Sequence, residues 1–541
     1  MTVHVESVLA FSLAAVLVVV AVHWVAGRSG LPAAAVLTVV GVVYALLPGP
    51  NIELDPAFVL TIIIPPLLYS AALDASLVAI RRNLRPVISL SVVLVFVTAL
   101  LIGVGFDLFV TGATLAVGVA LGAAVAPPDP VAALAVGRRA GLPNRITTLI
   151  QGEGLLNDAT ALTTLTVAVA AATGGGFSVG QAGLQFLLAA VGGLAVGAVI
   201  ALVVRLLRPL TSDPLGANAI SLATPFAAYL LGEVLHVSGV LAVVVAGLVV
   251  GHDAPRVGNG ASRLQVASVW RLVDYVLEGF VFLLIGQQLP TVVRGLSQYD
   301  TGTIVTACAI SVGVVVLLRP LWLLLMQLLP VGMHTRLGGG DRRSQRLSGR
   351  ELLVMSWAGT RGVISLAAIF TLPLTTDAGA PFPDRDLLLF CTFVVVLVTL
   401  VGGGLTFGPV VRLLGVRANA ADQARVRNEA RIAGVEAALS RLDEIGHDEN
   451  LGDDAVEAMR QQLEHRADRY RRRLDVLADA EDGELPISPG YEAAVRASRS
   501  VIDAQRDELL RWRDTGRLSD EGLRVIEREL DHQERLLPER G

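Results

Sequence analysis

Charged residues are scarce in this chain, and so are cysteines. Charged residues make up 17% of its 541 residues, against about 25% in an ordinary soluble domain. The two cysteines, Cys308 and Cys391, provide neither a disulfide framework nor metal-type spacing. The net charge of −5 is small for this length and indicates no nucleic-acid partner. The chain also has no GxxxxGK phosphate-binding loop followed by Ser or Thr, and no HExxH zinc motif, so nucleotide-driven transport and zinc hydrolysis are not expected.

Long apolar runs dominate instead. Hydrophobic residues make up 53% of the chain, and the mean hydropathy is +0.63. Runs such as "SVLAFSLAAVLVVVAVHWVAG" and "LLFCTFVVVLVTLVGGGL" reach the roughly 20 residues that a helix needs to cross a bilayer. The first run, from Ser7, is not a short apolar segment behind a basic one, so we expect a span and not a cleaved signal peptide. The sequence therefore predicts an all-α polytopic membrane protein.

About thirteen spans are predicted, and the charge of the loops between them alternates. The spans begin near Ser7, Leu31, Ala57, Leu84, Ala113, Thr147, Gln181, Ala217, Ser238, Leu272, Thr303, Glu351 and Leu387. One set of loops holds Arg28, Arg81, Arg82, Arg85, Arg138, Arg139, Arg145, Arg205, Arg208, Arg256, Arg263, Arg336, Arg342, Arg343, Arg346 and Arg350. The other set holds Glu53, Asp55, Asp107, Asp300, Asp377, Asp384 and Asp386, with Arg294 and Arg385 as minor exceptions. Because basic residues mark the cytoplasmic side, we expect the N-terminus outside the cell membrane and the C-terminus in the cytoplasm.

The composition changes after Arg417. Residues 418–541 are rich in Arg, Glu, Asp and Ala, and their apolar residues recur at helical spacing. Pro and Gly predict a loop at residues 483–490. We therefore divide the chain into a transmembrane domain, residues 1–417, and a cytosolic α-helical tail, residues 418–541. The tail is interpreted as a helical bundle that supports folding or dimer contact, and a regulatory role stays open.

Two acids lie inside the sixth predicted span, in "GEGLLNDATALT" (152–163). The preceding loop is predicted to be cytoplasmic, so Asp158 lies about eleven residues, or roughly 16 Å, into the span. That depth is close to the middle of a core about 30 Å thick. A carboxylate there costs about 2.5–3.5 kcal/mol and by default marks a functional site. Glu153 lies on another part of the helix surface, and it either serves a site or neutralises a buried arginine.

The preceding span is interrupted by proline, in "AVAPPDPVAAL" (124–134). Its prolines are Pro127, Pro128 and Pro130, which cannot donate backbone hydrogen bonds. The carbonyls of Ala123, Ala124 and Ala126 are therefore expected to be free. Broken helices at membrane depth are tolerated where they line a cavity, and transporters use such carbonyls to coordinate cations. Asp129 lies in the break, where its charge is expected to compensate a half-helix N-terminus.

Two arginines lie inside later spans, Arg319 in "VVVLLRPLWLLL" and Arg361 in "MSWAGTRGVISLAAI". Arginine keeps its charge in practice, so each needs a carboxylate or carbonyl partner. Glu153 and Asp129 are the candidates, and the residues alone do not decide which arginine pairs with Glu153. Glu278, in "VLEGFVFLLIG", is a further intramembrane acid whose partner stays open.

Five segments in this order resemble the monovalent cation/proton antiporter family. They are "PPLLYSAALD" (65–74), "APPDPVAALAV" (126–136), "GEGLLNDATAL" (152–162), "FVFLLIGQQL" (280–289) and "GTRGVISLAA" (359–368). The similarity is greatest to the electroneutral branch, which includes bacterial NhaP-type and animal sodium/proton exchangers, and it extends over about residues 10–415. The combination is specific, although each motif alone would be weak.

The resemblance implies two inverted repeats, with broken fifth and twelfth spans that cross near the bilayer centre. It also implies a homodimer and an elevator-like alternation of a core domain against a dimerisation domain. Asp158 would bind the cation or the proton, and Asn157 would hold the broken helices by hydrogen bonds. Glu153 and Arg361 resemble the buried ion pair of the family's core. Arg319 falls where the related electrogenic branch often has a lysine.

The chain departs from the family pattern at three positions. Pro128 replaces the threonine of Pro-Thr-Asp-Pro, and Gly154 replaces the serine of Glu-Ser-Leu-Leu-Asn-Asp. Ser70 replaces the glutamate of Pro-Pro-Leu-Leu-Phe-Glu. Fewer side-chain oxygens imply more carbonyl and water ligands, so we expect Asp129 and the Pro128 carbonyl to join Asp158 and Asn157 in ion binding. The choice between Na⁺ and K⁺ stays open.

A single titrating carboxylate predicts electroneutral exchange. Asp158 would carry one proton or one monovalent cation, and the empty charged site should cross with difficulty, because a bare carboxylate is costly in a low dielectric. The expected function is secondary exchange of Na⁺, or K⁺, for H⁺ across the cell membrane, without a cofactor. A monovalent cation channel and an ion-coupled solute symporter on the same type of fold are the alternatives. An intramembrane enzyme is disfavoured, because no convincing nucleophile–base pair lies on neighbouring spans.

Overall fold

The computed structural model describes most of the chain. The described residues are 5–29, 31–47, 58–130, 133–134, 137, 141–174, 179–210, 213–256, 260–328, 347–417, 420–448, 452–478, 489–535 and 537. Several predicted features lie outside them. These are the loop acids Glu53 and Asp55, the loop arginines Arg138, Arg139, Arg336, Arg342, Arg343 and Arg346, and residues 483–488 of the predicted tail loop.

The described residues form helices, which confirms the predicted all-α class. Strand-type pairing within these residues is limited to one isolated β-bridge, between Thr375 and Pro381. The chain divides into two compact units, Met1–Arg417 and Ala418–Gly541.

Seven helices in the described residues are long and apolar enough to cross a membrane. They are the continuous helix α6 (Leu84–Ile88), η2 (Ser89–Val93) and α7 (Leu94–Phe109), then α10 (Asn144–Thr173), α11 (Val179–Leu207), α12 (Pro214–Val234), α14 (Gly260–Gly295), α15 (Thr301–Leu328) and α18 (Arg385–Leu414). Other helices, most of them shorter, occupy the remaining predicted spans. They are α1 (Val5–Ser29), α2 (Ala33–Ala45), η1 (Val59–Ile63) with α4 (Ile64–Leu73), α8 (Leu115–Val125), α13 (Gly239–Asp253), α16 (Gly349–Trp357) and α17 (Val363–Phe370). The remaining short turns of helix are α5 (Leu77–Arg82), η3 (Arg208–Leu210) and η4 (Leu296–Gln298).

One span boundary differs clearly from its prediction. The span expected to begin near Leu272 belongs to α14, which begins at Gly260. The polar segment before Leu272 contains neither proline nor an internal glycine, so it continues the helix beyond the apolar stretch. Arg263, expected in a loop, therefore lies in this helix. Arg28, Arg205 and other predicted loop arginines likewise lie in the ends of helices, where long side chains reach the aqueous interface.

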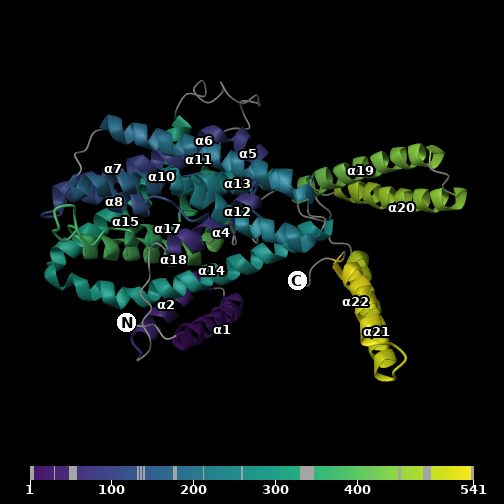
Figure 1. The fold of residues 1–541 in the computed structure, drawn as a ribbon. Helices are drawn as coiled ribbons and strands as arrows, with labels where there is room; N and C mark the ends of the chain where they lie inside the picture. The colour runs from purple at the N-terminus through teal and green to yellow at the C-terminus, as the bar shows by residue number, and fades with distance from the viewer. Residues whose placement is uncertain are drawn as a thin grey trace. The chain divides into compact units, whose positions relative to one another are not determined.

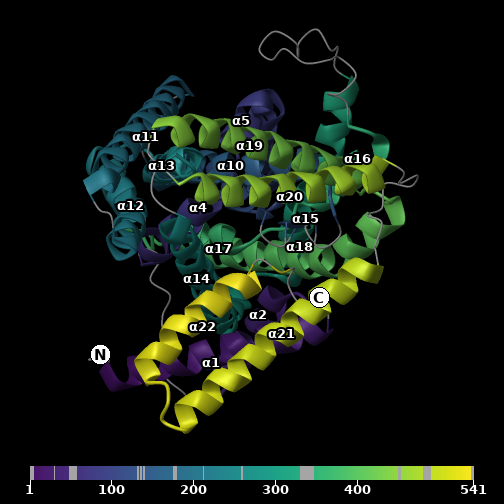
Figure 2. The same ribbon diagram turned by 90° about the vertical axis from the view of Figure 1, so that its right-hand side faces the viewer.

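The helices of residues 1–417 pack as two groups. We call α7, α8, α10 and α15 to α18 the crossing group, because it contains both broken spans. Within it, α8 packs against α7 and α10, and α15 packs against α7 and α18. We call α1, α2, α4 and α11 to α14 the flanking group. In it, the long α14 lies along α2 and α1 (Figure 1; Figure 2), and α13 packs against α4 and α11. Packing between the groups is sparser than within them.

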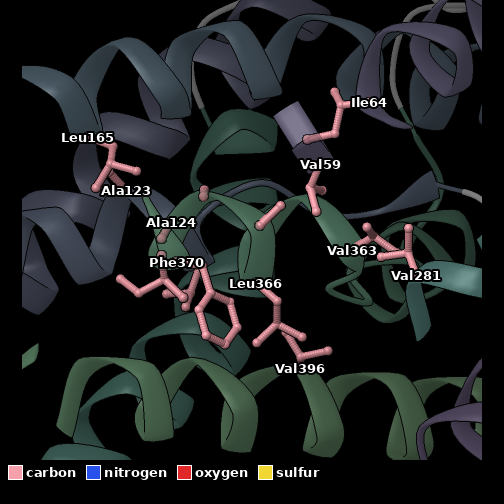
Figure 3. Packing of buried hydrophobic residues seen from close by; sticks show 14 of the residues in the cluster. Val59, Ile64, Ala123, Ala124, Leu165, Val281, Val363, Leu366, Phe370 and Val396 are labelled. Carbon is pink, nitrogen blue, oxygen red and sulfur yellow. The ribbon is translucent and has the colours of Figure 1, made fainter. Parts of the chain in front are cut away.

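The hydrophobic core joins these groups at α17. Ala123 and Ala124 of α8 are small enough for Phe370 of α17 to pack beside them (Figure 3). On another side of α17, Val363 lies beside Val281 of α14 (Figure 3). The broken helices are thus held close together by small residues, and one of them also contacts the flanking group. In the predicted order, six spans lie between the fifth and the twelfth. Because this number is even, the two broken spans run in opposite directions, as the inverted repeats implied by the resemblance require.

The unit Ala418–Gly541 contains two helical hairpins. Helix α19 (Ala420–Asp448) packs against α20 (Asp453–Ala478), and α21 (Pro489–Asp514) packs against α22 (Asp520–Arg535). Ala421 and Ala424 at the start of α19 form a buried cluster with Leu477 at the end of α20. The two helices are therefore antiparallel, as a short connection between helices favours.

Candidate functional site

The first broken span ends at its prolines. Helix α8 stops at Val125, and the backbone carbonyls of Val125 and Ala126 accept hydrogen bonds from Nε and Nη2 of Arg361, at 2.9 and 3.1 Å. Arg361 is 3% exposed, so its charge is satisfied inside the protein by the C-terminal end of α8. The prediction that the Ala126 carbonyl is free is therefore wrong, because a guanidinium from the second broken span already binds it.

The first break is residues 126–130 after α8, and the second is residues 358–362 before α17. Two hydrogen bonds between Asp129 and Thr360 connect them. The amide of Asp129 donates to the carbonyl of Thr360 at 2.7 Å, and the Thr360 hydroxyl donates to the carbonyl of Asp129 at 3.0 Å. The Asp129 carboxylate rests on Gly362, where a Cβ atom would lie 2.6 Å from the Asp129 Cγ. Because Gly362 is the N-cap of α17, the carboxylate faces the positive end of that helix. Glycine is required there by this close approach.

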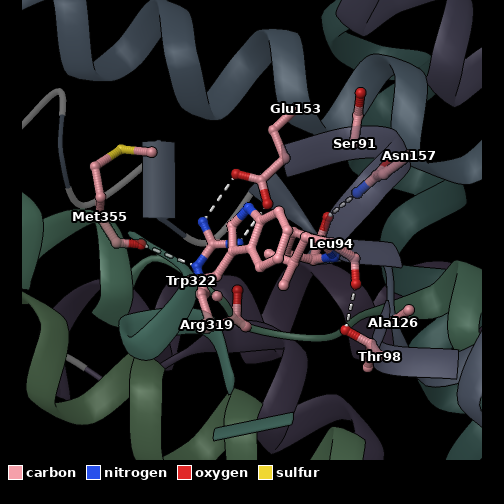
Figure 4. Close-up of polar contacts among 12 residues, drawn as sticks. Ser91, Leu94, Thr98, Ala126, Glu153, Asn157, Arg319, Trp322 and Met355 are labelled. Atoms are coloured by element: carbon pink, nitrogen blue, oxygen red, sulfur yellow. Dashed lines mark hydrogen bonds and ion pairs between the residues drawn. The ribbon is translucent and has the colours of Figure 1, made fainter. Parts of the chain in front are cut away.

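A buried ion pair fastens α10 to α15. Both guanidinium nitrogens Nη1 and Nη2 of Arg319 bind the Glu153 carboxylate, the second at 2.8 Å, and Nε donates to the carbonyl of Met355 at 3.0 Å (Figure 4). The two side chains are 3% and 1% exposed. The pairing of Glu153 with Arg361 that the family resemblance implies is corrected here, since Arg319 binds Glu153 while Arg361 binds backbone carbonyls.

Asn157 and Asp158 of α10 lie next to the place where the two breaks meet, which we call the crossing. The Asn157 Nδ2 donates to the carbonyl of Pro128 at 3.0 Å (Figure 4), so Asn157 holds the first break to α10. Its Oδ1 is buried and has no hydrogen-bond partner in the described part of the chain. Asp158 is 4% exposed, and its charge lies close enough to interact with that of Asp129.

Neither buried arginine neutralises Asp158. Arg319 is bound by Glu153, and Arg361 by the carbonyls of α8 and of Gly359. Among the described residues, no hydrogen bond or ion pair occupies the Asp158 carboxylate. A buried carboxylate without a partner is costly, so the crossing holds a negative charge that a proton or a cation can compensate.

Gly154 shows how closely α10 packs on the first break. A Cβ atom at this position would lie 2.5 Å from Cγ of Pro130. The serine of the family pattern is absent at this position, and the ring of Pro130 packs against Gly154. Pro130 occupies the space that a serine side chain would need.

The crossing uses two hydroxyl residues that sequence reasoning missed. Thr360 binds the Asp129 carbonyl, and the Thr399 hydroxyl on α18 accepts from the Arg361 amide at 3.0 Å. Thr360 was detectable as a polar residue beside a buried arginine and a glycine. Thr399 lies in the middle of an apolar run, and nothing in the sequence distinguishes it from a packing residue.

The ligands at the crossing are few. Within the described ranges, no group of three or more His, Cys, Asp or Glu side chains is placed to hold a metal ion. The available oxygens belong to Asp158, Asp129 and Asn157, with the Pro128 carbonyl already accepting from Asn157. Such an arrangement suits a weakly bound monovalent cation better than a tightly held multivalent one.

Known proteins resemble this chain in sequence and in fold. The family model for the transmembrane part of sodium/hydrogen exchangers matches residues 13–413. An uncharacterised Na⁺/H⁺ exchanger of Mycobacterium tuberculosis is 33% identical over 90% of this chain and 88% of its own. A sodium, potassium, lithium and rubidium/H⁺ antiporter of Bacillus pumilus is 32% identical over 67% of this chain and 55% of its own. The solved sodium/proton antiporter MjNhaP1 of Methanocaldococcus jannaschii has the same fold, with a TM-score of 0.61 and 18% identity over 77% of this chain and 99% of that one.

Proposed function

The chain belongs to the sodium/hydrogen exchanger family, and we propose that it exchanges Na⁺ or K⁺ for H⁺ across a membrane with Asp158 as the binding group. The observation that carries the proposal is the buried Asp158 at the crossing of two broken helices, with both buried arginines bound elsewhere. This leaves one negative charge to be compensated, and either a proton or a monovalent cation compensates it with the same net charge.

The exchange follows from that single charge. With a proton or a cation bound, the site is locally neutral and passes the low-dielectric barrier more easily than the bare carboxylate would. Only the loaded forms then move, which couples cation movement in one direction to proton movement in the other. One charge in each direction makes the exchange electroneutral and driven by ion gradients.

The neighbouring residues have supporting roles in this proposal. Asn157 positions Asp158 by holding Pro128, and its free Oδ1 is available to the cation. Asp129 compensates the N-terminus of α17 and adds negative charge beside Asp158. Glu153 and Arg319 keep α10 and α15 in register, and Arg361 keeps the two breaks together.

The choice of cation is drawn from the relatives and the ligands together. The Bacillus pumilus relative is described as an antiporter of sodium, potassium, lithium and rubidium, so this family accommodates cations of several sizes. The crossing of this chain has no side-chain hydroxyl at positions 128 and 154. Carbonyl and water ligands adapt to more than one cation radius, and we therefore propose transport of both Na⁺ and K⁺.

The cellular setting is proposed on similar grounds. We infer a multi-pass protein of the cell membrane with the N-terminus outside and the tail 418–541 in the cytoplasm, because the basic residues gather at the ends of helices that would face the cytoplasm. A homodimer is proposed from the family resemblance. A cation channel or solute symporter would need an open path or a solute pocket at the crossing, and the tight contacts of Gly362 and Gly154 favour neither.

Proton movement in everted membrane vesicles tests the function. A pH gradient is established, NaCl or KCl is added, and the wild type is compared with Asp158→Asn and with Asp107→Asn, which removes an exposed carboxylate at the end of α7. We expect wild type and Asp107→Asn to dissipate the gradient and Asp158→Asn to leave it unchanged. Collapsing the membrane voltage with a permeant anion such as thiocyanate should not alter the rate with NaCl. Full activity in Asp158→Asn, or a rate that follows the voltage, would contradict the proposal.

A further inference from the structure

One face of α14 carries two acids, Asp274 and Glu278, between the flanking group and the crossing. Trp270, Asp274, Glu278 and Val281 follow each other at intervals of four, four and three residues, so they share one face of the helix. At one end of this stripe, Trp270 donates to the Ser221 hydroxyl on α12 at 2.9 Å. At the other end, Val281 lies beside Val363 of α17 (Figure 3). The stripe thus runs from the flanking group to the broken helix.

Glu278 lies between these two contacts. Asp274, one turn before it, accepts a hydrogen bond from the Ser70 hydroxyl of α4 at 2.5 Å. Glu278 is partly buried, and its charge interacts with those of Asp129 and Asp274. Val281, one turn after it, touches the residue that directly follows Gly362, on which the Asp129 carboxylate rests. Glu278 therefore faces the side of the crossing where Asp129 lies.

An unpartnered hydroxyl lies at the same end of α17. Ser365 is 1% exposed, and its Oγ has no hydrogen-bond partner among the described residues. It is the third residue of α17, three positions after the N-cap residue. Residues three apart lie on the same face of a helix, and side chains incline toward its N-terminus. That N-cap is Gly362, the residue under the Asp129 carboxylate. A buried hydroxyl without a partner is costly, which indicates that something else uses its oxygen.

We propose that Glu278, Asp129 and Ser365 form a subsite that holds the transported monovalent cation next to Asp158. The inference rests on the proposed exchange function and adds ligands to it. Two carboxylates and a hydroxyl are the hard oxygen ligands that alkali cations prefer. Ser365 supplies the side-chain oxygen that Pro128 and Gly154 do not, since Pro130 fills the space beside Gly154.

The position of the subsite gives it a role in the transport cycle. Glu278 belongs to the flanking group, while Asp129 and Ser365 belong to the crossing group, and the two groups pack sparsely against each other. A relative movement of the groups separates Glu278 from the other two ligands. The cation then passes between the subsite and Asp158 at a boundary that opens, and the subsite lowers the concentration of cation needed for loading.

The test is the cation dependence of exchange in vesicles, with NaCl, KCl and LiCl as the probes. Glu278→Gln and Ser365→Ala should each raise the apparent KM for the cation, by about tenfold and by several-fold respectively, while the maximal rate stays within about twofold of wild type. Glu278→Asp moves the carboxylate by one methylene and should change the ratio of Na⁺ to K⁺ affinity, and Ser365→Thr should restore the KM that Ser365→Ala raises. All four variants are checked for folding by size-exclusion chromatography.

Matched controls separate this role from a structural one. Ser311→Ala removes a buried serine whose hydroxyl binds its own helix at Ala307, and Glu233→Gln removes an exposed acid of α12. Both should keep the wild-type KM. Wild-type KM values and an unchanged Na⁺ to K⁺ ratio in the Glu278 and Ser365 variants would overturn the subsite while wild-type exchange upholds the function. A wild type that moves no protons with any salt would refute the proposed function and the subsite with it.

Discussion

Replacing Arg319 by methionine should destabilise the protein strongly. The substitution removes the guanidinium that neutralises Glu153, on α10, and leaves that carboxylate 1% exposed with its charge unpaired. It also removes the donor that binds the Met355 carbonyl at 3.0 Å. The methionine side chain keeps most of the volume, so the change is mainly electrostatic and leaves little new cavity.

The magnitude follows from the burial of both partners. Breaking a buried ion pair on one side costs about 3–5 kcal/mol, because the remaining charge stays in a low dielectric. The unsatisfied Met355 carbonyl adds a cost of about 1–3 kcal/mol. The double variant Glu153→Leu/Arg319→Met removes both charges together, and replacing a whole buried pair by apolar side chains is often neutral or stabilising. We therefore expect the double variant to recover most of the loss and to keep only the part due to Met355.

Thermal unfolding of the detergent-purified protein, followed by fluorescence-detected size exclusion, measures these differences. Arg319→Met should unfold several degrees below wild type, and the double variant should lie between them. Arg441→Met is the control, because Arg441 pairs with Glu444 at 2.7 Å with both side chains more than half exposed, and such pairs contribute little. The reasoning is refuted if Arg319→Met unfolds with the wild type and the control, or if the double variant is less stable than the single one.

Two further substitutions test local features of the structure. Gly154→Ser, which introduces the serine of the family pattern, should lower both stability and exchange, because its Cβ would lie 2.5 Å from Pro130 Cγ. Adding Pro130→Ala to this variant should restore the melting temperature. A Gly154→Ser variant that melts and exchanges like the wild type would contradict the packing. Asp384→Asn should be as stable as wild type or more so at neutral pH. Partial burial raises the pKa of Asp384, with a hydrogen bond from Tyr299 acting against it, so the folded state disfavours the ionised form that prevails at neutral pH, and asparagine also tolerates the left-handed φ of 54° found here. The stability advantage of Asp384→Asn should shrink as the pH falls toward 4, where the wild-type carboxylate becomes protonated. Melting curves at neutral pH and near pH 4 test this, and a variant less stable than wild type at neutral pH would contradict the expected direction.

The sequence predicted the positions of most spans and the first interruption, because these depend on local chemistry. Prolines at 127, 128 and 130 end a helix wherever they occur, whereas the second interruption was expected only from the family resemblance. The start of α14 at Gly260 was missed because hydropathy marks only the apolar part of a span. The polar segment before Leu272 is also compatible with a helix, so α14 begins earlier than its apolar part. Apolarity and helicity coincide only within the hydrocarbon core.

The pairing of the buried charges could not be read from the sequence. From the residues alone, Glu153 and Asp129 were both candidate partners for either arginine, since all four residues lie within predicted spans. The choice depends on the lateral arrangement of α10, α15 and the two breaks, which long-range packing decides. Arg361 comes from the second break and meets the carbonyl end of α8, so it binds Val125 and Ala126. Arg319 comes from a neighbouring helix and is left to Glu153.

The departures of this chain from the family pattern at positions 128 and 154 belong, together with Pro130, to one packing arrangement. The Pro128 carbonyl is held by Asn157, and the Pro130 ring fills the space next to Gly154, three residues before Asn157 on the same helix. The first break is therefore held against α10 by the hydrogen bond from Asn157 and by the contact of the Pro130 ring with Gly154. A serine side chain at position 154 would clash with that ring. Apart from Asn157, these contacts consist of backbone and apolar groups, so positions 128, 130 and 154 offer the cation no side-chain oxygen. Discrimination between Na⁺ and K⁺ must then come from groups that reach the crossing from elsewhere, and α17 and α14 are the elements that supply them.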